Sequence, residues 1–169
     1  RAIKLIGQLT NIHHQKLEED RLRHEASTDL LTQIYNKITT EHLVSLELQE
    51  GRNHALIVVD LDKFKYANDT FGHLFGDSVI KAVAATLRAT FRATDIVGRT
   101  GGDEFVVLAK DISLSDGLET LKAKCRRLSV ELAHVSLGQD YVISASIGIS
   151  LFPRDGKTYA ELFAKADAA

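Results

Sequence analysis

Two short acidic segments carry the residue types that metal-assisted phosphate chemistry needs. Asp60-Leu61-Asp62 directly follows an apolar segment, and Asp103-Glu104 directly follows the pair Gly101-Gly102. Mg²⁺ and Mn²⁺ prefer carboxylate, water and phosphate oxygens as ligands, and glycine lets a substrate approach the backbone closely. Two such ions can bridge a triphosphate and activate a sugar hydroxyl. Taken alone, each segment is also typical of an ordinary acidic turn at the surface.

The sequence lacks several other catalytic arrangements. It contains no nucleophile elbow, no serine-histidine-acid arrangement and no P-loop of the G-x-x-x-x-G-K-[ST] type, so a nucleotide must be held by a different cradle. The scattered histidines, among them His54, lack metal-ligand spacing and are expected at the solvent surface. Because the net charge is −2, no non-specific binding to a nucleic-acid polymer is expected.

The acidic segments need a framework, and hydrophobic periodicity predicts one. The apolar run over residues 55–59 indicates a central strand that is covered on both faces. Segments 95–100 and 104–109 flank the two glycines and indicate a β-hairpin. Asp60 directly follows the predicted central strand, and Asp103 lies at the tip of the hairpin. If the hairpin lies beside the central strand, these two carboxylates converge.

Four helices and a further strand complete the expected framework. Apolar spacing predicts helices over residues 39–50, 79–91 and 118–132, and strict alternation predicts a strand over residues 143–151. Thr158 and Glu161 form a capping box before a last helix. The order of the elements implies an α/β fold in which helices flank a mixed central sheet.

Composition and charge divide the chain into two parts. The 169 residues, 44% hydrophobic and 26% charged, suit one globular domain, which we assign to residues 29–169. Residues 1–28 are interpreted as the possible end of an upstream sensor domain followed by a charged signalling helix, or as a plain solvated helix. No signal peptide or membrane-spanning run is present, so a cytoplasmic location is expected, with any membrane anchor outside this chain.

Several segments, in the right order and spacing, resemble the GGDEF family of diguanylate cyclases. The signature is Arg99-Thr100-Gly101-Gly102-Asp103-Glu104-Phe105, and residues 60–77 are similar to the family segment D-x-D-x-F-K-x-x-N-D…G-H…G-D. Later blocks match at residues 146–150 and 166–168. The resemblance covers about four-fifths of the chain and implies a palm-like fold, similar to that of adenylyl cyclases and polymerases.

The resemblance also implies an activity and its cofactors. Family members condense two GTP into cyclic di-GMP with release of two pyrophosphates. Asp60 and Asp103 are expected to bind two Mg²⁺ or Mn²⁺ ions per active site, with help from Glu104 and the backbone carbonyl of Leu61. Either Asp103 or Glu104 is expected to aid removal of the 3′-hydroxyl proton. Lys65 is expected to offset charge that develops on the phosphates.

The same resemblance implies how GTP is recognised. Asn68 and Asp77 are expected to read guanine, because an amide can donate to O6 while a carboxylate accepts from N1-H and the 2-amino group. Adenine presents the opposite pattern at those positions. His73 is expected to line the same pocket. The residues expected around the phosphates are Lys63, Phe64, Gly101 and Gly102.

Dimerisation and product inhibition follow from the same family pattern. One domain binds one GTP, whereas the product needs two phosphodiester bonds, so two sites must face each other in a homodimer. Arg92 and Asp95 match the family's R-x-x-D inhibitory product site, and arginine suits the O6/N7 edge of guanine. The alternative is an ordinary helix-to-strand connection that carries two charges.

The chain departs from the family pattern at two places, and two other functions stay open. Gln33 and Lys37 replace a glycine and an arginine of the family junction. The family continues past Ala169 with L-Y-x-A-K-x-x-G-R, so we expect a C-terminally truncated fragment that binds GTP poorly.

The alternatives to a diguanylate cyclase are a non-catalytic signalling receptor for GTP or cyclic di-GMP and a cyclase for another purine nucleotide. The retained carboxylates favour the diguanylate cyclase.

Overall fold

One four-stranded sheet forms the centre of the fold. The computed structural model describes residues 26–113, 116–138 and 140–169, so residues 1–25 of the expected connector lie outside the described part. The strands are β1 (His54–Leu61), β2 (Ile96–Arg99), β3 (Glu104–Ala109) and β4 (Ala145–Phe152). They lie in the order β2-β3-β1-β4 with antiparallel pairing, and Tyr35 adds an isolated parallel bridge to Gly98.

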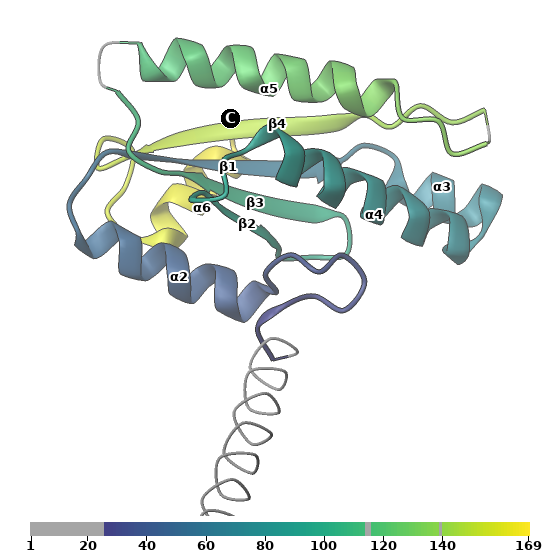
Figure 1. The fold of residues 1–169 in the computed structure, drawn as a ribbon, viewed down its shortest axis with the longest axis horizontal. Helices are drawn as coiled ribbons and strands as arrows, with labels where there is room; N and C mark the ends of the chain where they lie inside the picture. Colours follow the sequence, from purple (N-terminus) through teal and green to yellow (C-terminus); the bar gives the residue numbers. More distant parts are fainter. Residues whose placement is uncertain (1–25, 114–115, 139) are drawn as a thin grey trace, which may run out of the picture.

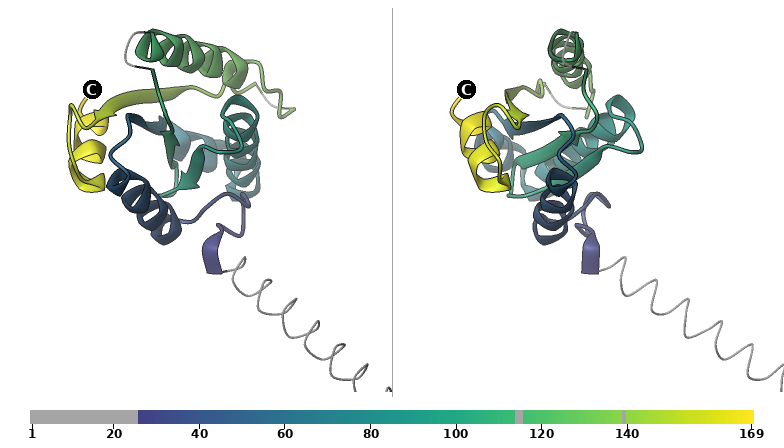
Figure 2. Two further views of the ribbon diagram at one scale, coloured as in Figure 1. Left: turned by 60° about the vertical axis from the view of Figure 1, so that its left-hand side comes forward. Right: turned by 90° about the vertical axis from the view of Figure 1, so that its left-hand side faces the viewer.

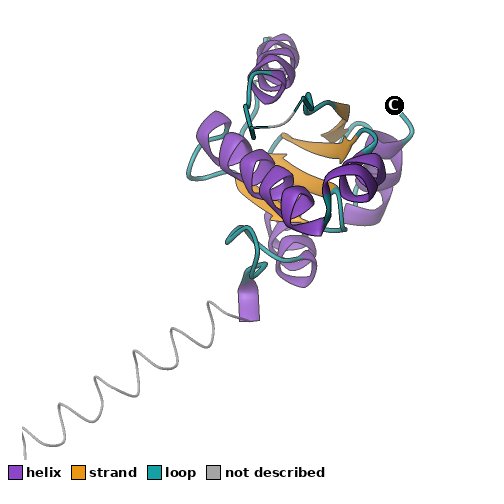
Figure 3. Cartoon of the chain, turned by 90° about the vertical axis from the view of Figure 1, so that its right-hand side faces the viewer, coloured by secondary structure: helices purple, strands orange, loops and turns teal. Residues whose placement is uncertain are grey.

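Helices cover both faces of this sheet (Figures 1 and 3). On one face lie α4 (His73–Thr90) and α5 (Gly117–Ala133), and on the other lie α2 (Lys37–Gln49) and α6 (Tyr159–Asp167). The short helix α3 (Phe64–Phe71) follows β1 and packs beside α4. Figure 2 shows the sheet enclosed between the helices. The expected α/β fold with helices flanking a central sheet is therefore confirmed, but the four strands pair antiparallel throughout and the sheet is not mixed as expected.

Alternate residues of β1 supply two separate hydrophobic cores. Ile57 and Val59 belong to the core under α4 and α5, whereas Leu56 and Val58 belong to the core under α2 and α6. These four side chains are at most 3% exposed. Because both faces of the strand are covered, it is apolar throughout rather than alternating, which confirms the prediction for residues 55–59.

The helices differ from their predicted ranges mainly at their first residues. Helix α2 begins at Lys37 instead of residue 39, because the Asn36 side chain accepts a hydrogen bond from the Thr39 N–H at 3.0 Å and caps the helix there. Helix α4 begins at His73 instead of residue 79, after Gly72 with φ of 87°. Helix α3 is missing from the sequence-based expectation, because eight residues are too few for a helical period to be recognised.

Two buried polar residues lie in the sheet, and one of them corrects a sequence-based expectation. His54 is fully buried rather than exposed, and its ring centroid lies 6.1 Å from that of Phe152. In β4 the serine face is covered at Ser150, whose hydroxyl donates to the Leu162 carbonyl of α6 at 2.8 Å, whereas Ser146 is exposed. Small side chains on this face let α6 pack directly on the backbone of the sheet.

At Gly148 the backbone of β4 lies close to that of α6, and this packing can be tested. A Cβ at this position would lie 1.8 Å from the Ala166 carbonyl oxygen. Because that contact is with backbone, we expect Gly148→Ala to lower the free energy of unfolding by about 1–3 kcal/mol, measured by urea denaturation. Gly102→Ala is the control, since a Cβ there meets nothing within 4 Å. Equal losses in the two variants would contradict this packing.

Candidate functional site

The end of β1 brings the two acidic segments together. Asp60 pairs with Glu104 of β3 on one side and with Ser146 of β4 on the other. The Leu61 N–H donates to the Asp103 carbonyl at 3.2 Å, which joins β1 to the tip of the hairpin. The convergence predicted for Asp60 and Asp103 is therefore present in the fold.

Like charges surround Asp60. Desolvation raises the pKa of its carboxyl above the ordinary value, and neighbouring carboxylates add to this effect, namely Asp103, Glu104, Asp62 and Asp167. A cation among these groups would relieve the repulsion. Across the described residues, no three histidine, cysteine or acidic side chains already stand together as a metal-ligand set. One or two carboxylates with water and phosphate oxygens nevertheless suffice for Mg²⁺, so the donor set fits a metal shared with a nucleotide.

The hairpin holds Glu104 in a defined position. The N–H groups of Thr100 and Gly101 donate to the Glu104 carbonyl at 3.0 and 3.3 Å, and the Thr100 hydroxyl donates to the Glu104 carboxylate. A Cβ on Gly101 would lie 3.1 Å from the Cβ of Glu104, whereas Gly102 faces open space. The two glycines thus leave the tip of the hairpin accessible beside its carboxylates.

The residues predicted to hold the phosphates lie where α3 begins. Lys63 precedes the helix with φ of 55°, in the left-handed region, and no side chain caps the helix there. The first recorded N–H partner at this end is that of Ala67, whose N–H donates to the Lys63 carbonyl at 3.2 Å. The N–H groups before it cannot find a partner inside the helix, and such groups bind phosphate at helix N-termini. Lys65 is exposed in the same turn. This N-terminus directly follows Leu61 and Asp62 of the acidic site.

The two residues predicted to read guanine lie at the contact between α3 and α4. A Cβ on Gly76 would lie 1.9 Å from Asn68 Oδ1, so the Asn68 amide rests against the backbone of α4. Asp77 is the next residue along that helix, while His73 is exposed at the helix start. Sequence reasoning did not assign Gly76 this role, although its place in the G-D pair was visible. The structure thus brings Asn68 close to the turn that carries Asp77.

Asp95 has a structural role in its loop. Its carboxylate accepts hydrogen bonds from the N–H groups of Arg92 at 2.9 Å and Lys110 at 3.0 Å. Arg92 and Asp95 also border a cavity of about 240 Å³, whose wall on α5 includes Lys124. These hydrogen bonds agree with the alternative that Arg92 and Asp95 belong to a helix-to-strand connection. The cavity beside this connection has room for a ligand.

Arg99 joins the hairpin to the segment that precedes α2. Its guanidinium donates to the two Asp29 carboxylate oxygens at 3.2 and 3.3 Å and to the Gly102 carbonyl at 2.7 Å. The backbone N–H of Arg99 donates to the Tyr35 carbonyl at 2.8 Å, and the Tyr35 N–H donates to the Val97 carbonyl at 3.2 Å. Sequence reasoning missed this link because no local pattern connects residues that lie 70 positions apart.

The Asp29 carboxyl is expected to make the stability of the folded state depend on pH. Desolvation alone would raise the pKa of its carboxyl, but hydrogen bonds from Thr32 and Arg99 and the Arg99 charge outweigh it and lower the pKa below 3.8. A lowered carboxyl pKa in the folded state stabilises the fold above about pH 4, and this contribution disappears as the pH falls through the folded pKa.

The variant Asp29→Asn isolates this contribution. We expect it to be less stable than the wild type at neutral pH, with a difference that shrinks as the pH falls from about 4 to about 2. Urea denaturation of both proteins across this range measures the difference. A gap that stays constant with pH would contradict the role of the Asp29 charge.

Comparisons with known proteins agree with this geometry. The family model described as diguanylate cyclase, GGDEF domain, matches residues 26–169. MucR of Pseudomonas aeruginosa, named a bifunctional diguanylate cyclase/cyclic di-GMP phosphodiesterase, is 38% identical over 83% of this chain and 21% of its own length. The diguanylate cyclase TpbB of the same species is 35% identical over 90% of this chain and 36% of its own length. Other relatives are named only as cyclic di-GMP phosphodiesterases.

A solved structure shares the fold as well as part of the sequence. A sensory box/GGDEF family protein from Caulobacter crescentus has 34% sequence identity and a TM-score of 0.76, over 85% of this chain and 94% of that one. The chain itself spans between about a fifth and two fifths of the length of the curated relatives that it matches. In the described part of the chain, no helix is both long enough and apolar enough to cross a membrane.

Proposed function

The chain belongs to the GGDEF domain family of diguanylate cyclases, and from this premise we propose that it condenses two GTP into cyclic di-GMP, with release of two pyrophosphates. The observation that carries the proposal is the pairing of Asp60 with Glu104, next to Asp103 at the hairpin tip. A domain that only bound a nucleotide would gain nothing from carboxylates that repel one another. Their juxtaposition suits chemistry on a metal-bound triphosphate.

Two Mg²⁺ or Mn²⁺ ions are the proposed cofactors of each site. Asp60, Asp103, Glu104 and the Leu61 carbonyl would hold them. When bound, such ions neutralise phosphate charge and favour ionisation of the 3′-hydroxyl. The pKa of Asp60 is raised mainly by burial and further by the neighbouring carboxylates, and this second contribution supports a cation at the site.

The side chains around the metal site divide the remaining tasks. Asp103 or Glu104 takes the proton of the 3′-hydroxyl, which then attacks the α-phosphorus of the other GTP. The N-terminus of α3, with Lys63 and Phe64, and the glycines of the hairpin hold the phosphates. Lys65 offsets the charge that develops on them. Asn68, Asp77 and His73 form the guanine pocket, supported by the Asn68 amide that rests on Gly76.

The complete reaction needs a second copy of this domain. Each phosphodiester bond joins the 3′-oxygen of one nucleotide to the α-phosphorus of the other, so two sites must face each other across a two-fold axis. We assign control of that encounter to an upstream sensor domain of the parent protein. Cyclic di-GMP itself would bind at Arg92 and Asp95 and inhibit the reaction, supported by the cavity beside these residues.

A receptor without catalytic activity is the second candidate. Relatives that are named only as cyclic di-GMP phosphodiesterases favour it, because in such proteins the domain matched by this chain could serve to bind a nucleotide. A receptor would retain nucleotide binding but form no product, so the two functions predict different results in one assay.

Substitution of Asp103 tests the proposed activity. The parent protein, which includes the residues beyond Ala169, is incubated with GTP and Mg²⁺, and its products are separated by chromatography. We expect Asp103→Asn to reduce formation of cyclic di-GMP by about 100-fold or more, because a metal ligand and proton acceptor is lost. Asp111→Asn, beyond the far end of β3, is the matched control and should retain activity. No product from the wild type, or equal rates for Asp103→Asn and wild type, would exclude the cyclase.

Product inhibition is tested separately at Arg92. Arg92→Ala removes the exposed guanidinium and leaves the Arg92 N–H that donates to Asp95. We expect the concentration of cyclic di-GMP that halves the rate to rise by about tenfold or more, while the initial rate stays unchanged. Inhibition curves with added product measure this concentration, and superimposable curves for the two proteins would reject the assignment.

A further inference from the structure

The carboxylates around the candidate metal site differ in how firmly they are held. Glu104 Oε1 accepts a hydrogen bond from the Thr100 hydroxyl. Both residues are half-buried, so water competes less for this hydrogen bond than it would at an open surface. In the part of the chain that the structure describes, no hydrogen bond reaches Glu104 Oε2 or the carboxylates of Asp60 and Asp103. Glu104 therefore has one bound oxygen and one available oxygen.

Thr100 stands at the end of a row of residues that crosses the sheet. Glu104 of β3 lies opposite Asp60 of β1, and Asp60 lies opposite Ser146 of β4. The Thr100 N–H donates to the Glu104 carbonyl at 3.0 Å, so Thr100 lies on the side of Glu104 that is away from Asp60. Because residues directly opposite one another share a face of a sheet, the Thr100 hydroxyl and the carboxylates of Glu104 and Asp60 lie on one face.

Glu104 needs an anchor because its neighbour in this row carries the same charge. Burial raises the pKa of Asp60 most, and the charges of Asp103 and Glu104 raise it further. A glutamate side chain has several rotatable bonds, so an unanchored Glu104 would reduce the repulsion by turning away from Asp60. The hydrogen bond from Thr100 opposes this movement and restricts where the second oxygen of Glu104 lies.

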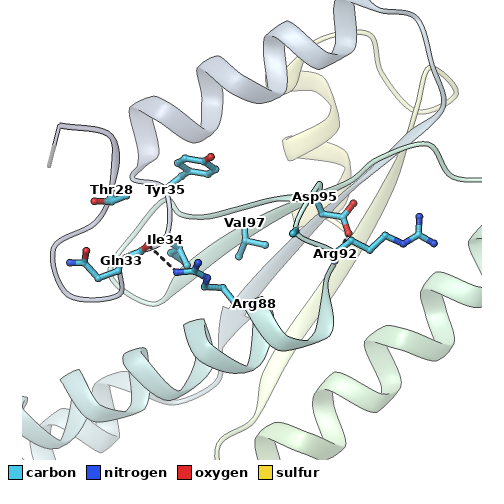
Figure 4. A pocket seen from close by; sticks show the side chains of 9 residues that line it. Thr28, Gln33, Ile34, Tyr35, Arg88, Arg92, Asp95 and Val97 are labelled. Carbon is cyan, nitrogen blue, oxygen red and sulfur yellow. Dashed lines mark hydrogen bonds between the residues drawn. The ribbon is translucent and has the colours of Figure 1, made fainter. Parts of the chain in front are cut away.

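The hairpin does not depend on the Thr100 hydroxyl for its own shape. The backbone N–H of Thr100 closes the hairpin on the Glu104 carbonyl. Figure 4 shows the segment with Tyr35 running beside β2 at Val97, where the Tyr35 N–H donates to the Val97 carbonyl at 3.2 Å. The Tyr35 carbonyl accepts the N–H of Arg99 at 2.8 Å. Loss of the hydroxyl therefore leaves these backbone contacts in place and frees only the Glu104 carboxylate.

We propose that Thr100 is a positioning residue of the cyclase site, an inference that rests on the proposed function. Its hydroxyl occupies one oxygen of Glu104 and leaves Oε2 as a single-oxygen ligand for the metal ions. Mg²⁺ tolerates little departure from ideal octahedral geometry, so the orientation of each carboxylate ligand matters. Loss of a hydrogen bond that orients a ligand commonly weakens metal binding by about 10–100-fold.

Metal binding without turnover tests this role, on the parent protein that includes the residues beyond Ala169. Mn²⁺ is titrated in the presence of 3′-deoxy-GTP, which lacks the attacking hydroxyl, and free Mn²⁺ is followed by electron paramagnetic resonance. Valine keeps the branched shape of Thr100 without its hydroxyl, whereas serine keeps the hydroxyl. We expect Thr100→Val to weaken Mn²⁺ binding by about tenfold or more, and Thr100→Ser to stay within about twofold of the wild type.

The matched control is Thr86→Val in α4. The Thr86 hydroxyl donates to the Ala82 carbonyl of the same helix at 2.9 Å, so the same substitution there removes a hydroxyl that does not touch the site. This variant should bind Mn²⁺ as the wild type does. Circular dichroism checks the folding of each variant, and Thr100→Ala takes the place of Thr100→Val if valine alters the spectrum.

A double-mutant comparison tests whether Thr100 acts through Glu104. In the Glu104→Ala background, we expect Thr100→Val to change the Mn²⁺ affinity by less than about twofold, because the carboxylate that the hydroxyl holds is absent. In the activity assay, the Mg²⁺ concentration that gives half-maximal formation of cyclic di-GMP should rise by about tenfold in Thr100→Val. The rate at saturating Mg²⁺ should change less.

Three results would overturn the proposal. Wild-type Mn²⁺ affinity in Thr100→Val would show that the hydroxyl does not position Glu104. Tighter binding in Thr100→Val would show that the hydroxyl competes with the metal. An undiminished effect in the Glu104→Ala background would give Thr100 a role independent of Glu104.

Failure of this inference is distinguishable from failure of the proposed function. Cyclic di-GMP formed by the wild type and lost in Asp103→Asn, with unchanged Mn²⁺ binding in Thr100→Val, would reject the role of Thr100 alone. No product from the wild type would reject the cyclase, and the Mn²⁺ titration would still decide whether Thr100 positions Glu104.

Discussion

The antiparallel pairing of β1 with β3 brings Asp60, Asp103 and Glu104 of the candidate site together. Its register runs from Ala55 opposite Ala109 to Asp60 opposite Glu104. Because side chains alternate between the faces of a sheet, a shift of one residue would move Asp60 to the opposite face. It would also move Leu56 and Val58 out of one core and into the other. Burial of both faces of β1 therefore specifies the register, and the register specifies the site.

This arrangement stores electrostatic repulsion in a well-packed frame. Burial raises the pKa of Asp60, and four neighbouring carboxylates raise it further, so ionised Asp60 destabilises the folded state when no cation is bound. The cost falls at the end of the sheet, where solvent and ligands have access, while the apolar ladder behind it supplies the stability. Functional sites commonly depart from optimal stability in this way.

The segment over residues 28–36 connects the N-terminal part of the chain to the site by direct contacts. Asp29 holds Arg99, and Arg99 holds the Gly102 carbonyl at the hairpin tip. Tyr35 adds backbone pairing to the edge strand β2, and Gln33 accepts a hydrogen bond from Arg88. A displacement of this segment would thus act on the hairpin through ion pairs and main-chain hydrogen bonds.

The sequence by itself determined the family, the central strand, the hairpin and the identity of the acidic residues, because these depend on local spacing and on an apolar run that needs no partner to be recognised. The sequence did not predict α3, because eight residues are too few to show a helical hydrophobic period. It also did not predict the early start of α4, because the residues after Gly72 show no such period. Tertiary structure alone decided that Arg99 binds Asp29, that Asn68 rests on Gly76 and that His54 is buried. Each of these contacts joins separate elements, and only the packing of the sheet against its helices decides which side chains meet there.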